Sequence, residues 1–239
     1  MLNQITNGIA AIAALGTASF GLVDSTKAFG GGISHCGFHR IQAAIQPLFG
    51  KAASAKDRST PLAFGALLDT LRANWMNGTD LDDQKAIAKS LLKLRLNPGN
   101  SAEYAAATGV DAAILSGVAA KLSTAEPLSP AETDTFGRFD LILTALLDEG
   151  YQRADHIFCN TAKLLAGLFS VVIAVFAGWD LHRGIPLLGT QALTTAYWGK
   201  SDMWTALLVG LLATPLAPVA KDLTSALVAG VNAVQAIGK

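Results

Sequence analysis

The sequence predicts an all-α integral membrane protein with three transmembrane helices and a cytoplasmic helical domain that is continuous with the second span. Apolar residues recur at helical spacing, and no alternating β-branched run indicates a strand. Only 15% of the 239 residues are charged, against about 25% in soluble domains. Charge is absent from residues 1–23, 164–179 and 203–220. The alternative is a soluble α protein with buried apolar helices, because runs of this length are short for membrane spans.

Residues 1–29 form the predicted N-terminal membrane anchor, with its span at residues 8–23. No Lys or Arg precedes this span, so we expect an uncleaved anchor instead of a signal peptide. Small residues share one face of the helix and would allow close approach of another helix in lipid. They are Ala11, Ala14, Ala18 and Gly21.

Residues 30–160 form the predicted cytoplasmic domain. Helices are expected at residues 33–49 and 59–76, then from Asp80 to a turn at residues 97–100, and at residues 110–122. In the third of these, Ile87, Leu91, Leu92 and Leu94 are expected to face inward, and Lys85, Lys89 and Lys93 outward.

A long helix is predicted from Ser129 to Trp179. Ser129, Pro130 and Glu132 provide an N-cap, a first-turn proline and a reciprocal cap. Gly150 is the expected position of a break or bend. The uncharged stretch 164–179 is the second span.

Residues 161–220 form the predicted transmembrane hairpin, with the third span at residues 203–220 and a kink at Pro215 and Pro218. Between the spans, residues 185–196 are apolar and are expected either to lie on the outer membrane surface or to dip into the membrane. Trp and Tyr prefer the membrane–water interface, and four of them flank this stretch: Trp179, Tyr197, Trp198 and Trp204. Residues 221–239 are predicted to form an amphipathic C-terminal helix.

Basic residues follow the first span: Lys27, Arg40, Lys51, Lys56 and Arg58. Because positive residues favour the cytoplasmic side, the N-terminus is predicted outside. The main domain and the C-terminus are then cytoplasmic, in a multi-pass protein of the cell inner membrane.

Cys36 and His39 read C-x-x-H, and His156 and Cys159 read H-x-x-C. Residues at i and i+3 share a helix face, and two thiolates with two imidazoles suit structural zinc. The alternative is that these side chains lie in a helical core without metal. A Cys36–Cys159 disulfide is not expected in a reducing cytoplasm.

Other motifs argue against enzymatic and nucleic-acid functions. The chain has no P-loop and no nucleophile elbow, and its balanced charge forms no basic stripe. The predicted spans hold no ionisable residue, which disfavours a proton relay or ion-coupled transport. We therefore expect that this protein is not an enzyme.

The segment Leu211–Pro215, followed by Asp222 and Leu223, resembles a Leu-Gly-Ala-Pro pattern in the last span of an uncharacterised group of bacterial integral membrane proteins. The aromatics of that pattern are missing here, and Pro218 is additional. The resemblance implies three spans and a cytoplasmic helical region.

These observations favour a membrane scaffold or accessory subunit that contacts the lipid bilayer and assembles as a homo-oligomer or with a membrane-protein partner. One alternative is an oligomeric pore lined by Ser170, Thr205 and Thr214. The second is a membrane-bound metalloprotein that uses the Cys/His residues.

Overall fold

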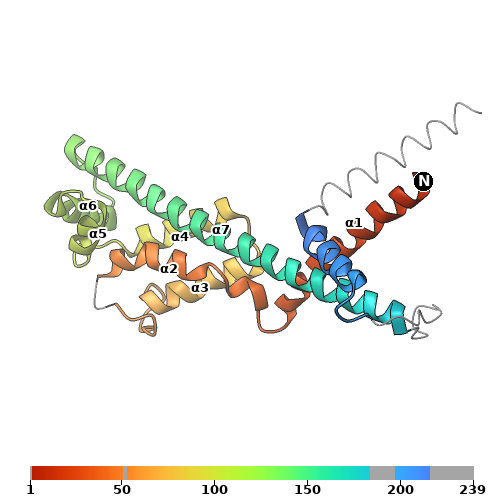
Figure 1. Ribbon diagram of the computed structural model, residues 1–239. Helices are drawn as coiled ribbons and strands as arrows, with labels where there is room; N and C mark the ends of the chain where they lie inside the picture. Colours follow the sequence, from red (N-terminus) through yellow and green to blue (C-terminus); the bar gives the residue numbers. More distant parts are fainter. Residues whose placement is uncertain (1, 51–52, 184–196, 216–239) are drawn as a thin grey trace, which may run out of the picture. The chain divides into compact units, whose positions relative to one another are not determined.

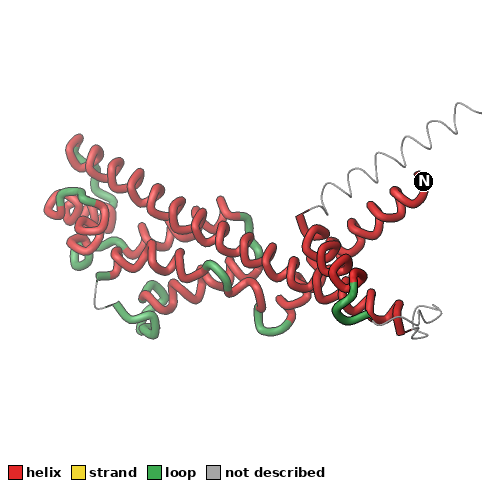
Figure 2. Tube along the Cα trace, in the orientation of Figure 1, coloured by secondary structure: helices red, strands yellow, loops and turns green. Residues whose placement is uncertain are grey.

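A computed structural model describes residues 2–50, 53–183 and 197–215, and every regular element in them is a helix (Figures 1 and 2). The predicted all-α class is confirmed. Two stretches are long and apolar enough to cross a membrane, Gly8–Ala28 and Pro130–Asp180. Three predicted features lie wholly or partly outside the described residues: the external stretch 185–196, the end of the third span and the C-terminal helix 221–239.

The chain divides into two compact units. Unit 1 comprises Met1–Ile33 and Cys159–Lys239, and unit 2 comprises Ser34–Phe158. The predicted cytoplasmic domain, residues 30–160, covers nearly the same stretch as unit 2.

Unit 2 is built from short helices packed along the first part of one long helix, α7 (Pro130–Arg183), drawn green to cyan in Figure 1. The short helices are α2 (Phe38–Ile45), η3 (Gln46–Phe49), α3 (Phe64–Asn77), α4 (Leu81–Arg95), α5 (Ser101–Thr108) and α6 (Ala112–Thr124). Helix α5 was not expected from the sequence.

The helix expected at residues 33–49 is interrupted. Residues Gly32–His35 form the 3-10 helix η2, and α2 begins only at Phe38. Gly37 has a φ of 90°, and a Cβ there would collide with the backbone carbonyl of Ala154 in α7. Close approach to α7 therefore requires glycine at this position and breaks the helix there.

The polar caps place three helix starts. The Asp80 side chain accepts from the N–H of Asp82 (2.9 Å), and Asp111 does the same for Ile114 (2.9 Å). At α7, the Ser129 N–H donates to Glu132 (2.7 Å), and the Glu132 N–H donates back to the Ser129 hydroxyl (3.4 Å). This is the predicted capping box.

The start expected near Ser59 is wrong, because α3 begins at Phe64. The N–H of Ser59 donates to the Asp57 carboxylate (3.0 Å), and the N–H of Gly65 donates to the Asp57 carbonyl (2.8 Å). These bonds hold the residues before α3 in a turn, and this turn competes with helix formation.

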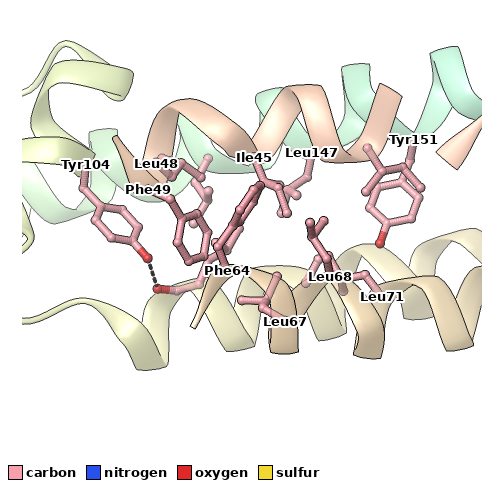
Figure 3. Packing of buried hydrophobic residues seen from close by; sticks show 14 of the residues in the cluster. Ile45, Leu48, Phe49, Phe64, Leu67, Leu68, Leu71, Tyr104, Leu147 and Tyr151 are labelled. Atoms are coloured by element: carbon pink, nitrogen blue, oxygen red, sulfur yellow. Dashed lines mark hydrogen bonds between the residues drawn. The ribbon is translucent and has the colours of Figure 1, made fainter. Parts of the chain in front are cut away.

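One hydrophobic core joins the helices of unit 2 (Figure 3). Two of its largest buried polar side chains reach backbone acceptors. The Tyr104 hydroxyl donates to the carbonyl of Leu92 (2.8 Å), and the Trp75 indole donates to the carbonyl of Ser34 (2.8 Å). These bonds satisfy groups that would be costly to bury alone.

Helix α7 is not broken at Gly150, contrary to the sequence-based expectation. A Cβ built at Gly150 would lie 2.6 Å from the Cβ of Ala44. Glycine here lets α2 pack closely against α7 and does not end the helix.

The lysine face of α4 pairs with acidic residues of α7. Lys89 and Lys93 contact the Asp140 carboxylate at 2.7 and 3.1 Å, and Lys85 contacts Asp148 at 2.9 Å. Leu94 was expected inside but is 71% exposed.

Unit 1 contains α1 (Leu2–Ser25), η1 (Thr26–Ala28), the part of α7 after residue 159, and a further helix at residues 201–215. On α1, Gly16, Ser19 and Val23 are buried. The four small residues at positions 11, 14, 18 and 21 lie on the other side of α1 and are exposed.

Candidate functional site

The predicted metal ligands do not form a site in the described structure. Cys36 precedes Gly37 and lies outside α2, so it does not share a helix face with His39 as expected. His39 and His156 are exposed, and Cys36 and Cys159 are partly buried and are not joined in a disulfide. Among residues 2–50, 53–183 and 197–215, no three His, Cys, Asp or Glu side chains are grouped to hold a metal ion. The zinc site stays a prediction that this placement does not favour.

In unit 1, the helix at residues 201–215 and the later part of α7 meet through small residues. A Cβ at Gly210 would lie 2.6 Å from the Cα of Val171 and 3.0 Å from the carbonyl oxygen of Ser170. Four residues further along, the Thr214 hydroxyl lies 4.0 Å from a Cβ built on Gly167. The later helix therefore runs antiparallel to α7, and the small side chains permit close helix packing in lipid.

Aromatic residues gather at the other end of this hairpin. The Tyr197 ring lies against Gly178, and its hydroxyl donates to the carbonyl of Val175 (3.1 Å). Trp198 stacks edge-on to Tyr197, with ring centroids 5.6 Å apart, and Trp179 contacts Phe176. Tyr197, Trp198 and Trp179 are three of the four aromatic residues for which the sequence predicts a place at the membrane–water interface.

A cavity of about 780 Å³ opens beside the small-residue contact. This volume is within the range of small-molecule sites. All three described helices of unit 1 contribute to it, and its wall is almost entirely apolar. The lining residues are Phe20, Lys163, Leu164, Gly167, Leu168, Val171, Leu211, Thr214 and Pro215.

Two hydroxyl groups in this region lack hydrogen-bond partners. The side-chain oxygens of Ser170 and Thr214 are buried, and neither has a hydrogen-bond partner among the residues that the structure describes. Thr214 is 8% exposed and lines the cavity. A buried polar group without a partner is costly, so the Thr214 hydroxyl marks a place where a ligand atom would add a bond.

The cavity has its charged group at one end. Lys163 makes no ion pair with the other residues that the structure describes. Gly167 and Val171 follow it at one-turn intervals of about 5.4 Å. The wall thus changes from cationic at Lys163, to hydroxyl-bearing beside Gly167, to apolar beside Val171.

Of the three residues expected to line a pore, only Thr205 is exposed. Its hydroxyl donates to the carbonyl of Ser201 in its own helix (2.9 Å). Ser170 and Thr214 are buried within unit 1.

The shifted pKa values in unit 2 belong to structural groups. Lys121 and the Ser129 backbone lower the pKa of Glu132 to about 2. Burial raises the pKa of Asp140, but the ammonium groups of Lys89 and Lys93 outweigh it, and the pKa lies below its ordinary value. Burial raises the pKa of Tyr151. These groups are engaged in packing, capping or ion pairs, which is also a common source of shifted pKa values.

Sequence reasoning missed the cavity. Lys163 is visible at the edge of the uncharged stretch, and Gly167 and Gly210 are visible as small residues. These residues come together only because two helices, separated by some forty residues of chain, pack in one particular register. No periodicity in the sequence specifies that register.

No protein-family model, no curated protein and no solved structure matches this chain.

Proposed function

We propose that this chain is an integral membrane protein that acts as a scaffold or accessory subunit. It assembles through its transmembrane helices with a second copy or with another membrane protein. The single observation that carries the proposal is the exposure of the most apolar helices.

The spanning candidates are not core helices. In the most apolar 18-residue window, only 11% of the residues in α7 are buried, and 17% in the window of α1. A core helix of a soluble protein with the same composition would be mostly buried, because burial of apolar area drives folding in water. An N-terminal signal sequence passes the same length and composition test as α1, so α7 supports the membrane assignment more strongly.

Exposed large apolar side chains are concentrated in unit 1. Outside it, the described residues include only Leu94, Leu122 and Leu141. In unit 1 they follow both spanning helices and the helix at residues 201–215: Phe20, Leu22, Phe29, Leu164, Leu168, Val172, Phe176, Trp198, Trp204, Leu208, Val209, Leu211 and Leu212. Many exposed apolar side chains on one unit are unfavourable in water and suit lipid or a partner helix.

The exposed small-residue face of α1 supports assembly. The face comprises Ala11, Ala14, Ala18 and Gly21, and a Cβ added at Gly21 would meet nothing within 4 Å. Such faces let helix backbones approach closely, which is the main source of packing energy between helices in lipid.

The test is to express the full chain, extract the membranes with alkaline carbonate and measure the mass of the detergent-purified complex. We expect the chain to stay in the carbonate pellet and to purify with a mass above that of one chain plus detergent. Recovery in the carbonate supernatant would overturn the membrane proposal. A monomer that brings down no partner in a native pull-down would overturn the assembly proposal alone.

A further inference from the structure

We propose that the cavity of unit 1 binds one anionic phospholipid, with its phosphate at Lys163, its ester oxygens at Thr214 and an acyl chain along the apolar wall. This inference rests on the proposed membrane location and adds a specific ligand to it.

The order of chemistry along the cavity matches the order of groups in a phospholipid. Lys163 provides a cation at the end of the uncharged stretch 164–179, and it has no ion-pair partner within the described part of the chain. One helical turn further, Gly167 leaves room for the Thr214 hydroxyl. The cavity is also lined by Val171, Leu211 and Phe20, whose side chains are apolar.

Charge complementarity selects the headgroup. A lysine ammonium at a membrane interface attracts anionic lipid, and a net-neutral headgroup lacks this attraction. The stem of Lys163 can lie along apolar wall while the ammonium stays at the level of the phosphates.

The Thr214 hydroxyl selects the backbone linkage. It is more than nine-tenths buried, it lacks a partner and it lines the cavity. An ester carbonyl one turn below the phosphate is an acceptor at the right level. An ether-linked lipid of the same length lacks this carbonyl.

The experiment uses the full chain in neutral detergent, titrated with phosphatidylglycerol or phosphatidylcholine of matched acyl chains and observed by native mass spectrometry. We expect one lipid per chain and a preference for phosphatidylglycerol. Lys163→Gln is expected to reduce that preference about two- to tenfold, which is the range expected for one lysine near an anionic lipid surface. Lys200→Gln, a matched exposed lysine of unit 1 away from the cavity, should leave it unchanged.

A second variant tests the hydroxyl. The wild type is expected to bind diester phosphatidylglycerol about two- to tenfold more tightly than the diether analogue. Thr214→Val keeps the volume of the side chain and should abolish that difference. Both variants must retain the helix content and mass distribution of the wild type.

Equal binding of the two headgroups would overturn the inference. So would equal effects of Lys163→Gln and Lys200→Gln, or an unchanged ester preference in Thr214→Val. A photoreactive residue at Leu168 should label lipid; if it labels residues 216–239, the occupant is the chain's own tail. Each of these results could be obtained while the chain stays in the carbonate pellet, so it would leave the proposed membrane function standing. Release of the chain into the carbonate supernatant would overturn both the membrane function and the lipid site.

Discussion

At the scale of single residues, Gly150 and Gly137 are two glycines of α7 in opposite surroundings. A Cβ at Gly150 would press on Ala44, whereas a Cβ at Gly137 meets nothing within 4 Å. Both positions would gain up to about 1 kcal/mol of helix propensity from alanine. The difference between them therefore isolates the cost of close packing.

We expect Gly150→Ala to lower the free energy of unfolding by about 1–3 kcal/mol, as is typical of overpacking. Gly137→Ala should raise it by about 0.5–1 kcal/mol. The measurement is thermal or urea unfolding followed by circular dichroism. Equal stabilisation by both variants would show that α2 does not approach α7 at Ala44.

Glu132 is the residue whose charge has the clearest link to pH. It bonds Lys121 at 2.7 Å and the N–H of Ser129 at 2.7 Å. These contacts lower its pKa to about 2, against about 4.3 in an unfolded chain. A lowered pKa in the folded state means that the carboxylate stabilises the fold above about pH 4.3. The contribution is lost as the pH falls toward 2.

We expect Glu132→Gln to lower the Tm at pH 7 and to have little effect near pH 2. The measurement is the Tm difference between variant and wild type across this range. Glu149→Gln is the control, because among the described residues the ion pair of Glu149 is with Arg153 on its own helix. A Tm difference for Glu132→Gln that stays constant with pH would contradict the ionised capping box.

At the scale of elements, α4 is tied to α7 by its lysine face. Lys89 and Lys93 converge on Asp140, whose side chain is 29% exposed. Asp148 pairs with Lys85, which also bonds Asp82 on its own helix at 2.7 Å. Loss of Asp140 leaves two ammonium groups without that partner, whereas loss of Asp148 leaves Lys85 with Asp82.

We therefore expect Asp140→Asn to cost about 1–2 kcal/mol of unfolding free energy, after allowance for partial exposure. Asp148→Asn should cost less than about 0.5 kcal/mol. The cost at Asp140 should shrink in high salt. Denaturant titrations of both variants at two salt concentrations check this, and equal costs would contradict the asymmetry.

The small-residue face of α1 is the second element with a testable role. Ala14→Leu and Ala18→Leu are expected to shift the detergent-purified complex toward lower mass, because leucine prevents close approach of helix backbones. Thr17→Leu is the control, since Thr17 is exposed on the same helix and lies off this face. A mass that stays the same in all three variants would mean that assembly does not use this face.

At the scale of the whole molecule, the two units differ in what their surfaces suit. Unit 2 encloses one core, and its described surface carries ion pairs such as Arg58–Asp69 and Arg153–Glu149. Unit 1 exposes large apolar side chains along its helices. The first pattern suits water and the second suits lipid, which is why the proposed function assigns the membrane role to unit 1.

The sequence by itself determined the helical class, the capped starts of α4 and α7, and the positions of the uncharged stretches. Each of these depends on neighbouring residues: an aspartate or serine at a cap, a helical period, or the absence of charge over some sixteen positions. Features that depend on neighbouring residues can be predicted directly from the sequence.

Only the tertiary structure decided what depends on distant residues. The sequence predicts a helix through Gly37 and a break at Gly150, but the structure interrupts the helix at Gly37 and not at Gly150. The close approach of the Ala154 backbone and of the Ala44 side chain explains this difference. Cys36 and His39 share a motif, yet the bend at Gly37 separates them. The cavity at Lys163 and Thr214 exists because two helices pack in one register, and packing is set by side-chain shape across the contact.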